Sequence, residues 1–284
     1  MDYRFTIRRD FDLGASVTCG QVFRWRAVDS CTWAGVTGNQ AYWVTERGDK
    51  YEVASNHDEG AFRRLFRLDH DWSGLIKRIE SAGIASADPW IRTMDSPSPV
   101  ETLFSFMCTA NNNLARIQPM VEVLGRHGEP VWEHQGTTFC SFPDVDTVSQ
   151  ISIDSMVRSG FGYRARQIAA AALTLRELGG EKFLEGLKKT DRQEATAQLC
   201  RLTGVGQKVA DCTTLHGLGQ TSAVPVDTHI WRFAVEKWFP KWRGQSMTAG
   251  RYQAVGDMFR ELFGTEAGLA QQLVFHGALR AKVG

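Results

Sequence analysis

The chain has 284 residues, 43% of them hydrophobic and 23% charged, which is the composition of an ordinary globular protein with one large core or a few small ones. Its formal net charge is only +1, so composition alone does not indicate a nucleic-acid partner, and a DNA-binding face would require the basic residues to gather on one side. No run of about 18 apolar residues occurs, and the first residues have no apolar signal-peptide core, which favours an intracellular, soluble protein.

The cysteines give no sign of a metal site. None of the six stands in a CxxC pair, and their spacing matches neither zinc nor iron–sulfur ligands. We therefore expect free thiols in a reducing compartment and no bound metal. The six are Cys19, Cys31, Cys108, Cys140, Cys200 and Cys212.

The first part of the chain predicts an antiparallel β-sheet. Apolar and polar residues alternate in QVFRWRAV, CTWAGVT, QAYWVTER and KYEVAS, with DS, GN and GD as turns between them, so residues 1–56 predict a β-meander. Residues 58–84 change to a helical period and predict helices that cover the sheet. We therefore expect an α+β domain over residues 1–87.

Residues 88–284 predict helices throughout. Apolar residues recur at i, i+3 and i+4 in DPWIRTM, PVETLFSFMCTANNNLARIQPMVEVLGRHG, YRARQIAAAALTLRELGG, RQEATAQLCRL and residues 247–284. Glycine or proline separates these segments, and no repeat of fixed period or low-complexity stretch occurs. The second part of the chain is therefore expected to be a separate helical region.

A glycine turn at residues 203–206, TGVG, joins two of these predicted helices. We expect Gly204 and Gly206 to adopt positive φ and to let another backbone approach closely. The second helix begins with free N–H groups and the positive end of its dipole, which together suit a phosphate. A tight glycine turn between two core helices is also common without any ligand, so the turn alone leaves both interpretations open.

Lys208 and Asp227 make the turn more informative. Lys208 lies in the first turn of the second helix, where the dipole and partial burial disfavour a charged ammonium group, as a nucleophilic amine requires. Asp227 follows 19 residues later, after an extended segment that leads into another helix. Taken singly, Lys208 fits a surface lysine and Asp227 fits an N-cap. The combination resembles the helix–hairpin–helix, Gly/Pro-rich-loop, Asp superfamily of DNA base-excision glycosylases.

Four further segments stand out, and each also has an ordinary structural explanation. CGQVFRW, which contains Gly20, fits a turn that enters a sheet. NNNLARI places three amides in a helical region, which fits a kinked connector, although amides facing a cleft could contact base edges. GFGYRAR fits a helix start with a basic face, or an aromatic wedge with phosphate contacts. Gln271 and Phe275 share a helix face, where phenylalanine is usually core and glutamine usually solvated.

In chain order, GQVFRW, FSFMCTANNNLARI, GFGYRAR, LTGVGQKVADC, AVPVDTHIW and QQLVFHGALR resemble the successive motifs of the eukaryotic-type 8-oxoguanine DNA glycosylases. The resemblance spans residues 11–279. It implies an N-terminal antiparallel sheet domain with covering helices, followed over residues 88–284 by an all-α helix–hairpin–helix glycosylase region of two helical subdomains. Within that region the hairpin is expected at residues 192–218 and the catalytic aspartate loop at residues 223–230.

The same resemblance implies a bifunctional N-glycosylase and AP lyase that excises 8-oxoguanine opposite cytosine from duplex DNA. Lys208 matches the nucleophile that attacks C1′ of the damaged nucleotide and forms a Schiff base. Asp227 matches the carboxylate that stabilises the developing positive charge and assists proton transfer. Because an amine attacks in place of water, β-elimination is expected to nick the strand 3′ to the lesion.

Recognition of the base is assigned by the resemblance to residues far apart in the sequence. The backbone carbonyl at Gly20 would accept a hydrogen bond from N7–H, which 8-oxoguanine has and guanine lacks. This contact alone gives about ten- to hundredfold discrimination, so base extrusion has to supply the remainder. Cys212 and Phe275 would sandwich the flipped base, and Gln271 would bind its Watson–Crick edge.

Other matched positions lie where the family contacts the surrounding DNA. The residues that hold the orphaned cytosine, and the wedge beside it, match Asn111, Arg116, Arg164 and Tyr163. The positions that contact phosphates match Gly204, Gly206, Gln207 and His229. The expected partner is double-stranded DNA containing 8-oxoguanine, bound by a monomer without membrane contact. No cofactor is expected to be required, and the sequence leaves open whether the hairpin carbonyls recruit a monovalent cation when DNA is bound.

The sequence departs from the family in one motif, and two rival interpretations stay open. Thr203 replaces the usual proline of the hairpin, which puts its rigidity in doubt. The N-terminus has no transit segment or basic localisation cluster, which suits the cytoplasm or nucleoid of a prokaryote, whereas a eukaryotic protein would be nuclear. The rivals are a sister glycosylase for another damaged or mispaired base and a non-enzymatic helix–hairpin–helix DNA-binding module. Gly20, Gln271 and Phe275 argue against the first, and retention of both Lys208 and Asp227 argues against the second.

Overall fold

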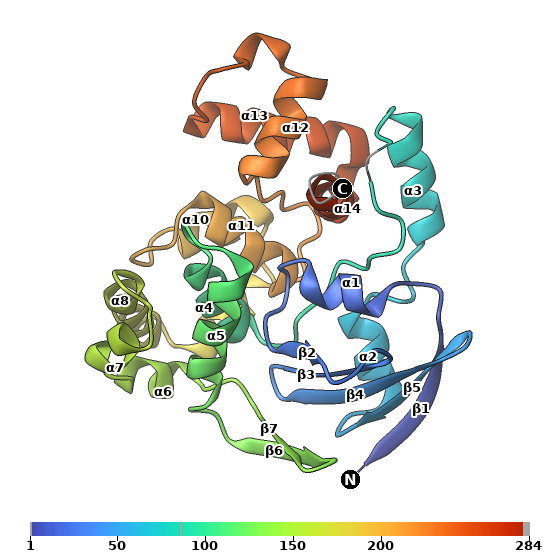
Figure 1. Ribbon diagram of the computed structural model, residues 1–284. Helices are drawn as coiled ribbons and strands as arrows, with labels where there is room; N and C mark the ends of the chain where they lie inside the picture. Colours follow the sequence, from blue (N-terminus) through green and yellow to red (C-terminus); the bar gives the residue numbers. More distant parts are fainter. Residues whose placement is uncertain (1, 86, 281–284) are drawn as a thin grey trace.

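The computed structural model describes residues 2–85 and 87–280, and its N-terminal part is a five-stranded antiparallel sheet in the order β1-β5-β4-β3-β2 (Figure 1). The predicted sheet is therefore confirmed. Two-residue turns at Gly38 and Gly48, both with positive φ, join its three central strands, as the GN and GD pairs predicted. The strands are β1 (Tyr3–Arg8), β2 (Trp25–Ala27), β3 (Thr32–Thr37), β4 (Gln40–Arg47) and β5 (Lys50–Ser55).

The meander prediction missed two elements at the N-terminus. β1 is an edge strand in which only Ile7 is buried, and its alternation of apolar and polar residues over Tyr3–Arg8 was overlooked. The helix α1 (Leu13–Thr18) is too short to show a helical period, and the Asp12 side chain fixes its start by accepting a hydrogen bond from the amide of Ala15 at 2.8 Å. Only Trp25–Ala27, in the second half of QVFRWRAV, forms a strand, β2.

The two helices predicted after the sheet form, but only one covers it. In α2 (Glu59–Leu65), Phe62 and Leu65 pack into the core of the sheet. In α3 (Trp72–Ser81), Trp72, Leu75 and Ile79 instead pack against the C-terminal helices. Figure 1 shows α3 beside α14, away from the strands. The chain therefore begins to build its C-terminal core before residue 87, where we expected a domain boundary.

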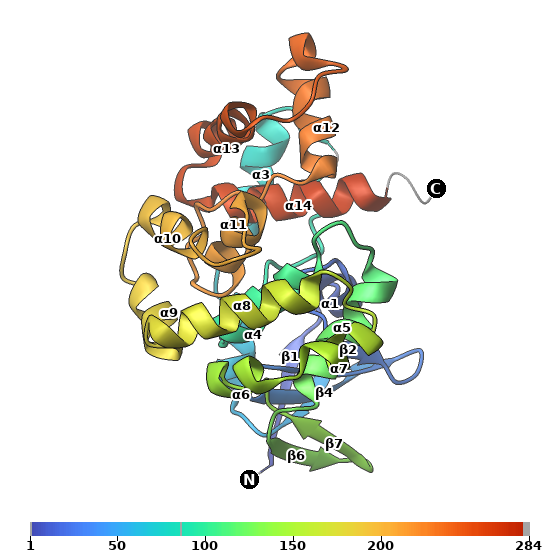
Figure 2. The same ribbon diagram turned by 90° about the vertical axis from the view of Figure 1, so that its left-hand side faces the viewer.

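The helical region has two separate cores, in agreement with the two expected subdomains. The first core unites α4 (Pro99–Cys108), α5 (Leu114–Gly125), α6 (Val145–Gln150), α7 (Ile153–Arg158), α8 (Arg164–Glu177), α9 (Glu181–Leu187), α10 (Arg192–Leu199) and α11 (Gln207–His216). The second unites α3 with α12 (Thr228–Lys237), α13 (Ala249–Phe263) and α14 (Ala267–Arg280). Short 3-10 turns lie at Pro240–Trp242 and Gly264–Glu266. Figure 2 shows α12 and α13 above α14, with α10 and α11 to its left.

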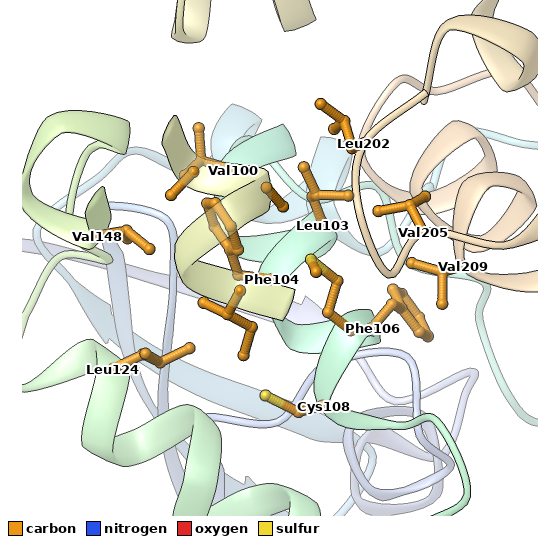
Figure 3. Packing of buried hydrophobic residues seen from close by; sticks show 14 of the residues in the cluster. Val100, Leu103, Phe104, Phe106, Cys108, Leu124, Val148, Leu202, Val205 and Val209 are labelled. Carbon is orange, nitrogen blue, oxygen red and sulfur yellow. The ribbon is translucent and has the colours of Figure 1, made fainter. Parts of the chain in front are cut away.

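The helix α11 belongs to both cores. Val209, Ala210 and Cys212 pack into the first core, whereas Leu215 packs into the second. Figure 3 shows Val209 and Phe106 where α11 meets α4. The helix that follows the glycine turn is therefore held on both sides by buried apolar side chains.

Two parts of the region predicted as all-helical are not helical. Strands β6 (Pro130–His134) and β7 (Thr137–Cys140) form a hairpin, whose Trp132 and Phe139 cover the face of the large sheet that carries Ala34 and Val36. DPWIRTM, at residues 88–94, is not helical: residues 89–90 form a turn and residues 91–94 have no regular secondary structure. Its Ile91 and Met94 are buried in two different cores, so the segment runs between packed layers and lacks a single apolar face.

Candidate active site

Six residues singled out in the sequence line one cavity of about 40 Å³. They come from the turn before β2, from α11, from the segment before α12 and from α14. The structure thus brings together positions spread over more than 250 residues of sequence. The six are Gly20, Lys208, Cys212, Asp227, Gln271 and Phe275.

The glycine turn is correctly predicted, but its two glycines have different roles. Gly204 has φ +81°, and a Cβ there would lie 2.7 Å from the Cβ of Gln167 on α8, so the position requires glycine. Gly206 has φ −92°, which any residue adopts, so the prediction of positive φ was wrong for it. Gly206 is the N-cap of α11, and no side chain caps this helix. Its first N–H groups are therefore available to an anion.

The amine of Lys208 is half-buried at the cavity wall. Its Nζ donates a hydrogen bond to Oγ1 of Thr109 at 3.2 Å and lies 5.0 Å from the centre of the Phe106 ring. The aromatic face and the hydroxyl hold the flexible side chain in one position. Lys208 is therefore aimed into the cavity and forms no salt bridge among the described residues.

Cys212 lies one turn after Lys208 on the same face of α11. It is 4% exposed, and burial raises the pKa of its thiol to about 11, although the nearby Lys208 acts in the opposite direction. The thiol therefore stays protonated at neutral pH, and a protonated thiol is a poor nucleophile. Cys212 supplies an apolar wall beside the amine.

Asp227 is the predicted N-cap of α12. Its Oδ1 accepts hydrogen bonds from the amides of His229 and Ile230, both at 2.9 Å, and its other oxygen, Oδ2, takes part in neither bond. The side chain is half-buried and lines the cavity together with Lys208. A fixed carboxylate and a fixed amine therefore face the same space.

A buried hydrogen-bond chain positions the segment before Asp227. The amide of Val226 donates to the hydroxyl of Tyr252 at 3.1 Å, and this hydroxyl donates to Oδ2 of Asp211 at 2.7 Å. Asp211 lies on α11, where it also accepts from Nε2 of Gln207 at 3.2 Å and from the hydroxyl of Thr196 at 3.3 Å. The chain links the helix that carries Lys208 to the residue that precedes Asp227.

Gly20 occupies a turn that is fixed by its neighbour. Gly20 has φ +85°, and Gln21 is 3% exposed. The Nε2 group of Gln21 donates to the carbonyls of Ser16 at 2.8 Å and Arg92 at 2.7 Å, while its Oε1 accepts from the amide of Met94 at 2.9 Å. All the hydrogen-bonding groups of this buried amide serve to lock the turn, which holds Gly20 at the cavity.

The last wall of the cavity comes from α14. Gln271 is 3% exposed, and its Oε1 has no hydrogen-bond partner among the described residues. A buried acceptor without a partner is costly, and a ligand that donates an N–H group would relieve this cost. Phe275 is half-buried one turn later, with its ring 5.7 Å from that of His229 at an interplanar angle of 89°.

Four other residues line the same cavity and were not singled out in the sequence. His216 has a recognisable signal, because it continues the series of Lys208 and Cys212 at intervals of four residues along α11. The other three carry no local signal, since the fold alone brings them to the site. They are Phe106, Pro225 and Gln272.

The residues matched to the orphaned cytosine gather at a different place, the loop between α4 and α5. Asn111 is exposed with φ +48°, and Arg116 is exposed at the start of α5. Tyr163, 51% exposed, donates from its hydroxyl to the carbonyl of Ala110 at 3.3 Å. Thr109, the partner of Lys208, immediately precedes this loop. The loop therefore connects directly to the cavity wall.

Arg164, which the resemblance also matches to the orphaned cytosine, is buried in this structure. Only 5% of it is exposed. Its Nε donates to the carbonyl of Ala110 at 2.9 Å, one of its terminal nitrogens donates to the carbonyl of Asn111 at 3.0 Å, and its guanidinium lies 4.7 Å from the centre of the Tyr163 ring. In this structure Arg164 holds the loop that presents Asn111.

The residues matched to phosphate contacts lie at the starts of two helices. Gly204, Gly206 and Gln207 belong to the glycine turn and the open N-terminus of α11, whereas His229 belongs to the first turn of α12. The described residues contain no group of three or more His, Cys, Asp and Glu side chains able to hold a metal ion. Within the described ranges, no helix is both long and apolar enough to span a membrane.

Comparisons with known proteins point to one group. No protein-family model matches the chain. It is 33% identical over 277 residues to the N-glycosylase/DNA lyase OGG1 of Arabidopsis thaliana, covering 93% of this chain and 76% of that protein. It is 32% identical over 187 residues to the N-glycosylase/DNA lyase of Saccharomyces cerevisiae, covering 60% of this chain and 49% of that protein.

A solved structure agrees over almost the whole chain. This is the 8-oxoguanine glycosylase/lyase of Clostridium acetobutylicum in complex with double-stranded DNA containing cytosine opposite 8-oxoG. The two chains superpose with a TM-score of 0.85 at 25% sequence identity, covering 99% of this chain and 98% of the other. The same protein in its apo form gives a TM-score of 0.80 at 26% identity. The sheet, both helical cores and their order along the chain are thus shared.

Proposed function

The chain belongs to the family of 8-oxoguanine DNA N-glycosylases/DNA lyases, and on that premise we propose that Lys208 and Asp227 carry out its reaction. It is a DNA repair enzyme that acts on DNA with 8-oxoguanine opposite cytosine. The observation that supports the assignment of residues is the cavity, since an amine and a carboxylate meet there with the four residues matched to base recognition. The base to be excised is too deep in a duplex to reach this cavity unless it is flipped out.

In the proposed reaction, Nζ of Lys208 attacks C1′ as the bond from C1′ to N9 of the base breaks. The electron pair of that bond leaves with the base, which takes up a proton. Asp227 faces the same space and stabilises the positive charge that develops on the sugar. The attached amine loses one proton, the bond from C1′ to the ring oxygen breaks as that oxygen takes up a proton, and a protonated Schiff base forms between Nζ and C1′.

The second half of the proposed reaction cuts the strand. Loss of a proton from C2′ of the Schiff base expels the 3′ phosphate, and hydrolysis then returns the free lysine. Asp227 is the carboxylate placed to move protons in these steps, because its Oδ2 takes part in neither bond of the α12 cap. The positions of Thr109 and Phe106 keep the amine at one place throughout.

Recognition of the lesion is assigned to the other residues that line the cavity. We assign the carbonyl at Gly20 to N7–H of 8-oxoguanine, a hydrogen that guanine lacks. The unpartnered Oε1 of Gln271 supports its assignment to N–H groups of the Watson–Crick edge. Cys212 and Phe275 are assigned to the two faces of the base, and the neutral thiol suits such an apolar contact.

Contacts with the surrounding DNA are assigned to the loop between α4 and α5 with the start of α8 beside it, and to the N-termini of α11 and α12. Asn111, Arg116, Tyr163 and Arg164 form the proposed site of the orphaned cytosine and wedge. Phosphates are assigned to the open N-terminus of α11 and to His229. A monomer bound to duplex DNA inside the cell completes this proposal.

A monovalent cation at the glycine turn is compatible with the groups present there. The carbonyls of Thr203 and Val205 accept no hydrogen bond among the described residues, so both oxygens are available as ligands. Backbone carbonyl oxygens suit a monovalent cation, which would add positive charge beside a DNA phosphate. The chemistry proposed for Lys208 does not require it.

The test is covalent trapping with borohydride, which reduces a Schiff base to a stable amine. We expect an adduct with a duplex that contains 8-oxoguanine opposite cytosine, and we expect Lys208→Ala to abolish it. Lys189→Ala, at an exposed lysine outside the cavity, is the matched control and should trap like the wild type. Trapping that survives Lys208→Ala would remove Lys208 as the nucleophile. A panel of other lesions, mispaired adenine included, decides whether another base is preferred.

A further inference from the structure

The imidazole of His216 lines the base cavity but has no role in the chemistry described above. It is 3% exposed, and its ring stacks on Phe106 with 5.6 Å between the centres and an interplanar angle of 17°. It belongs to the face of α11 that carries Lys208 and Cys212.

The hydrogen bond at Nδ1 fixes the tautomer. Nδ1 lies 3.2 Å from the carbonyl oxygen of Met94. A carbonyl can only accept, so Nδ1 carries the hydrogen and donates it. In a neutral ring the lone pair then resides on Nε2. Nε2 forms no hydrogen bond among the described residues, so its acceptor capacity is free.

The ring stays neutral at physiological pH. Burial lowers the pKa of His216 to about 3, and the nearby cations Arg67 and Lys208 act in the same direction. Three acceptors therefore gather in one cavity: Nε2 of His216, Oε1 of Gln271 and the carbonyl proposed at Gly20. Such a set favours a ligand rich in N–H groups.

The hydrogens of 8-oxoguanine can be matched to these acceptors. N7–H is assigned to Gly20, and the Watson–Crick edge adds N1–H and the two hydrogens of the 2-amino group. Gln271 offers this edge only one acceptor atom, its Oε1. The 2-amino group thus has a hydrogen to spare, and an acceptor is available for it on the neighbouring wall.

We propose that His216 determines specificity in this enzyme, with its Nε2 accepting a hydrogen bond from the 2-amino group of the flipped base. This inference rests on the proposed function. It gives the cavity a means to distinguish 8-oxoguanine from oxidised purines that lack the amine, which the contact at N7 cannot do. A hydrogen bond of this kind contributes about a three- to tenfold preference.

The test compares two lesions that differ only in the amine, 8-oxoguanine and 8-oxohypoxanthine, each opposite cytosine under single-turnover conditions. His216→Asn is the informative variant, because its side-chain amide can still donate to Met94 but cannot reach as far as Nε2. His216→Gln is the second variant, since its longer amide can present an oxygen to the cavity. We expect the wild type to prefer 8-oxoguanine, His216→Asn to lose about three- to tenfold of this preference, and His216→Gln to regain part of it.

Two results would overturn the proposal. One is equal excision of both lesions by the wild type, a measurement that needs no variant to fold. The other is an equal loss on both lesions in His216→Asn, which would reduce His216 to a support for the segment at Met94. Cleavage of a preformed abasic site is the internal control, because it requires Lys208 but no base. A wild type that cleaves this site but excises neither lesion would contradict the proposed function and not this inference alone.

Discussion

The carboxylate of Asp227 has two oxygens with separate tasks. Oδ1 caps α12 by accepting from two backbone amides, whereas Oδ2 is outside this cap and is assigned to the chemistry. Asparagine is also a good N-cap, so Asp227→Asn should preserve the helix start while removing the negative charge. The substitution therefore separates the structural role from the catalytic one.

We expect Asp227→Asn to lower the single-turnover excision rate by about a hundredfold or more, because charge stabilisation is lost in the transition state. Affinity for lesion-containing DNA, measured by fluorescence anisotropy, should change by less than about threefold, since no phosphate contact is assigned to Asp227. Equal losses in rate and affinity would leave Asp227 with the capping role only.

At the scale of residues, sequence motifs predicted some of the side chains that line the cavity but missed others. Gly20, Lys208 and Gln271 stand in motifs whose order along the chain could be recognised before any geometry was known. Phe106 and Pro225 reach the cavity only through the packing of α4 and of the loop before α12, which no local pattern encodes. The burial of Arg164 against the Tyr163 ring has no local sequence signal either, because it depends on the neighbouring loop.

Among the elements, α11 is joined to the loop before α12 by the Asp211–Tyr252–Val226 hydrogen bonds. Burial raises the pKa of both Asp211 and Tyr252. Removal of the hydroxyl by Tyr252→Phe would leave the amide of Val226 and an oxygen of Asp211 without this partner. Unsatisfied buried groups of this kind cost about 1–3 kcal/mol each.

We expect Tyr252→Phe to lower the thermal unfolding midpoint and also kcat, because the loop that carries Asp227 loses an anchor while the sheet and the base walls keep theirs. Gln253→Ala, at an exposed position of the same helix, is the control and should change neither quantity. The informative readout is the excision rate compared with the affinity for lesion-containing DNA. A variant that is less stable but has unchanged kcat at a temperature where it is folded would show that the chain of hydrogen bonds serves stability alone.

The sequence predicts best those helices and strands that bury only one face and are long enough to show a periodic pattern of apolar residues. α3, α12 and α13 meet this condition, as does β5. Residues 88–94 have apolar residues at helical spacing, yet they form no helix, because the Gln21 amide and the His216 ring bind the backbone of Arg92 and Met94. Hydrogen bonds from distant residues replaced those that a helix would have made.

For the whole molecule, Glu101 connects the sheet to the first helical core. It is 4% exposed on α4, its Oε2 accepts from the amide of Gly38 in the β3–β4 turn, and it lies 3.9 Å from the buried guanidinium of Arg24. Burial raises the pKa of Glu101 from 4.5 to about 7, with Arg24 acting in the opposite direction. The folded protein therefore binds this proton more tightly than the unfolded chain does.

The contribution of Glu101 to stability is complete below pH 4.5 and is lost as the pH rises through about 7, by up to about 3 kcal/mol. We expect Glu101→Gln, which cannot titrate, to gain stability relative to the wild type as the pH rises from about 5 to 8. The thermal unfolding midpoints of both proteins across this range provide the measurement.

The matched control is Glu122→Gln. Glu122 lies 3.8 Å from the same guanidinium, but its side chain is 48% exposed. Its replacement should leave the slope of stability against pH unchanged. If Glu101→Gln and the wild type show parallel curves, the carboxylate of Glu101 is already charged throughout the range and the interface with the sheet does not depend on its proton.

Because α11 belongs to both helical cores, the catalytic pair depends on the folding of both. Neither core alone can assemble the catalytic pair, since the apolar residues around Lys208 belong to one core, whereas Val226 and Ile230, which flank Asp227, belong to the other. A nascent or damaged chain that has folded only one of these cores possesses the glycine turn without the pocket. Lys208 and Asp227 therefore come together only in a chain that has folded both cores.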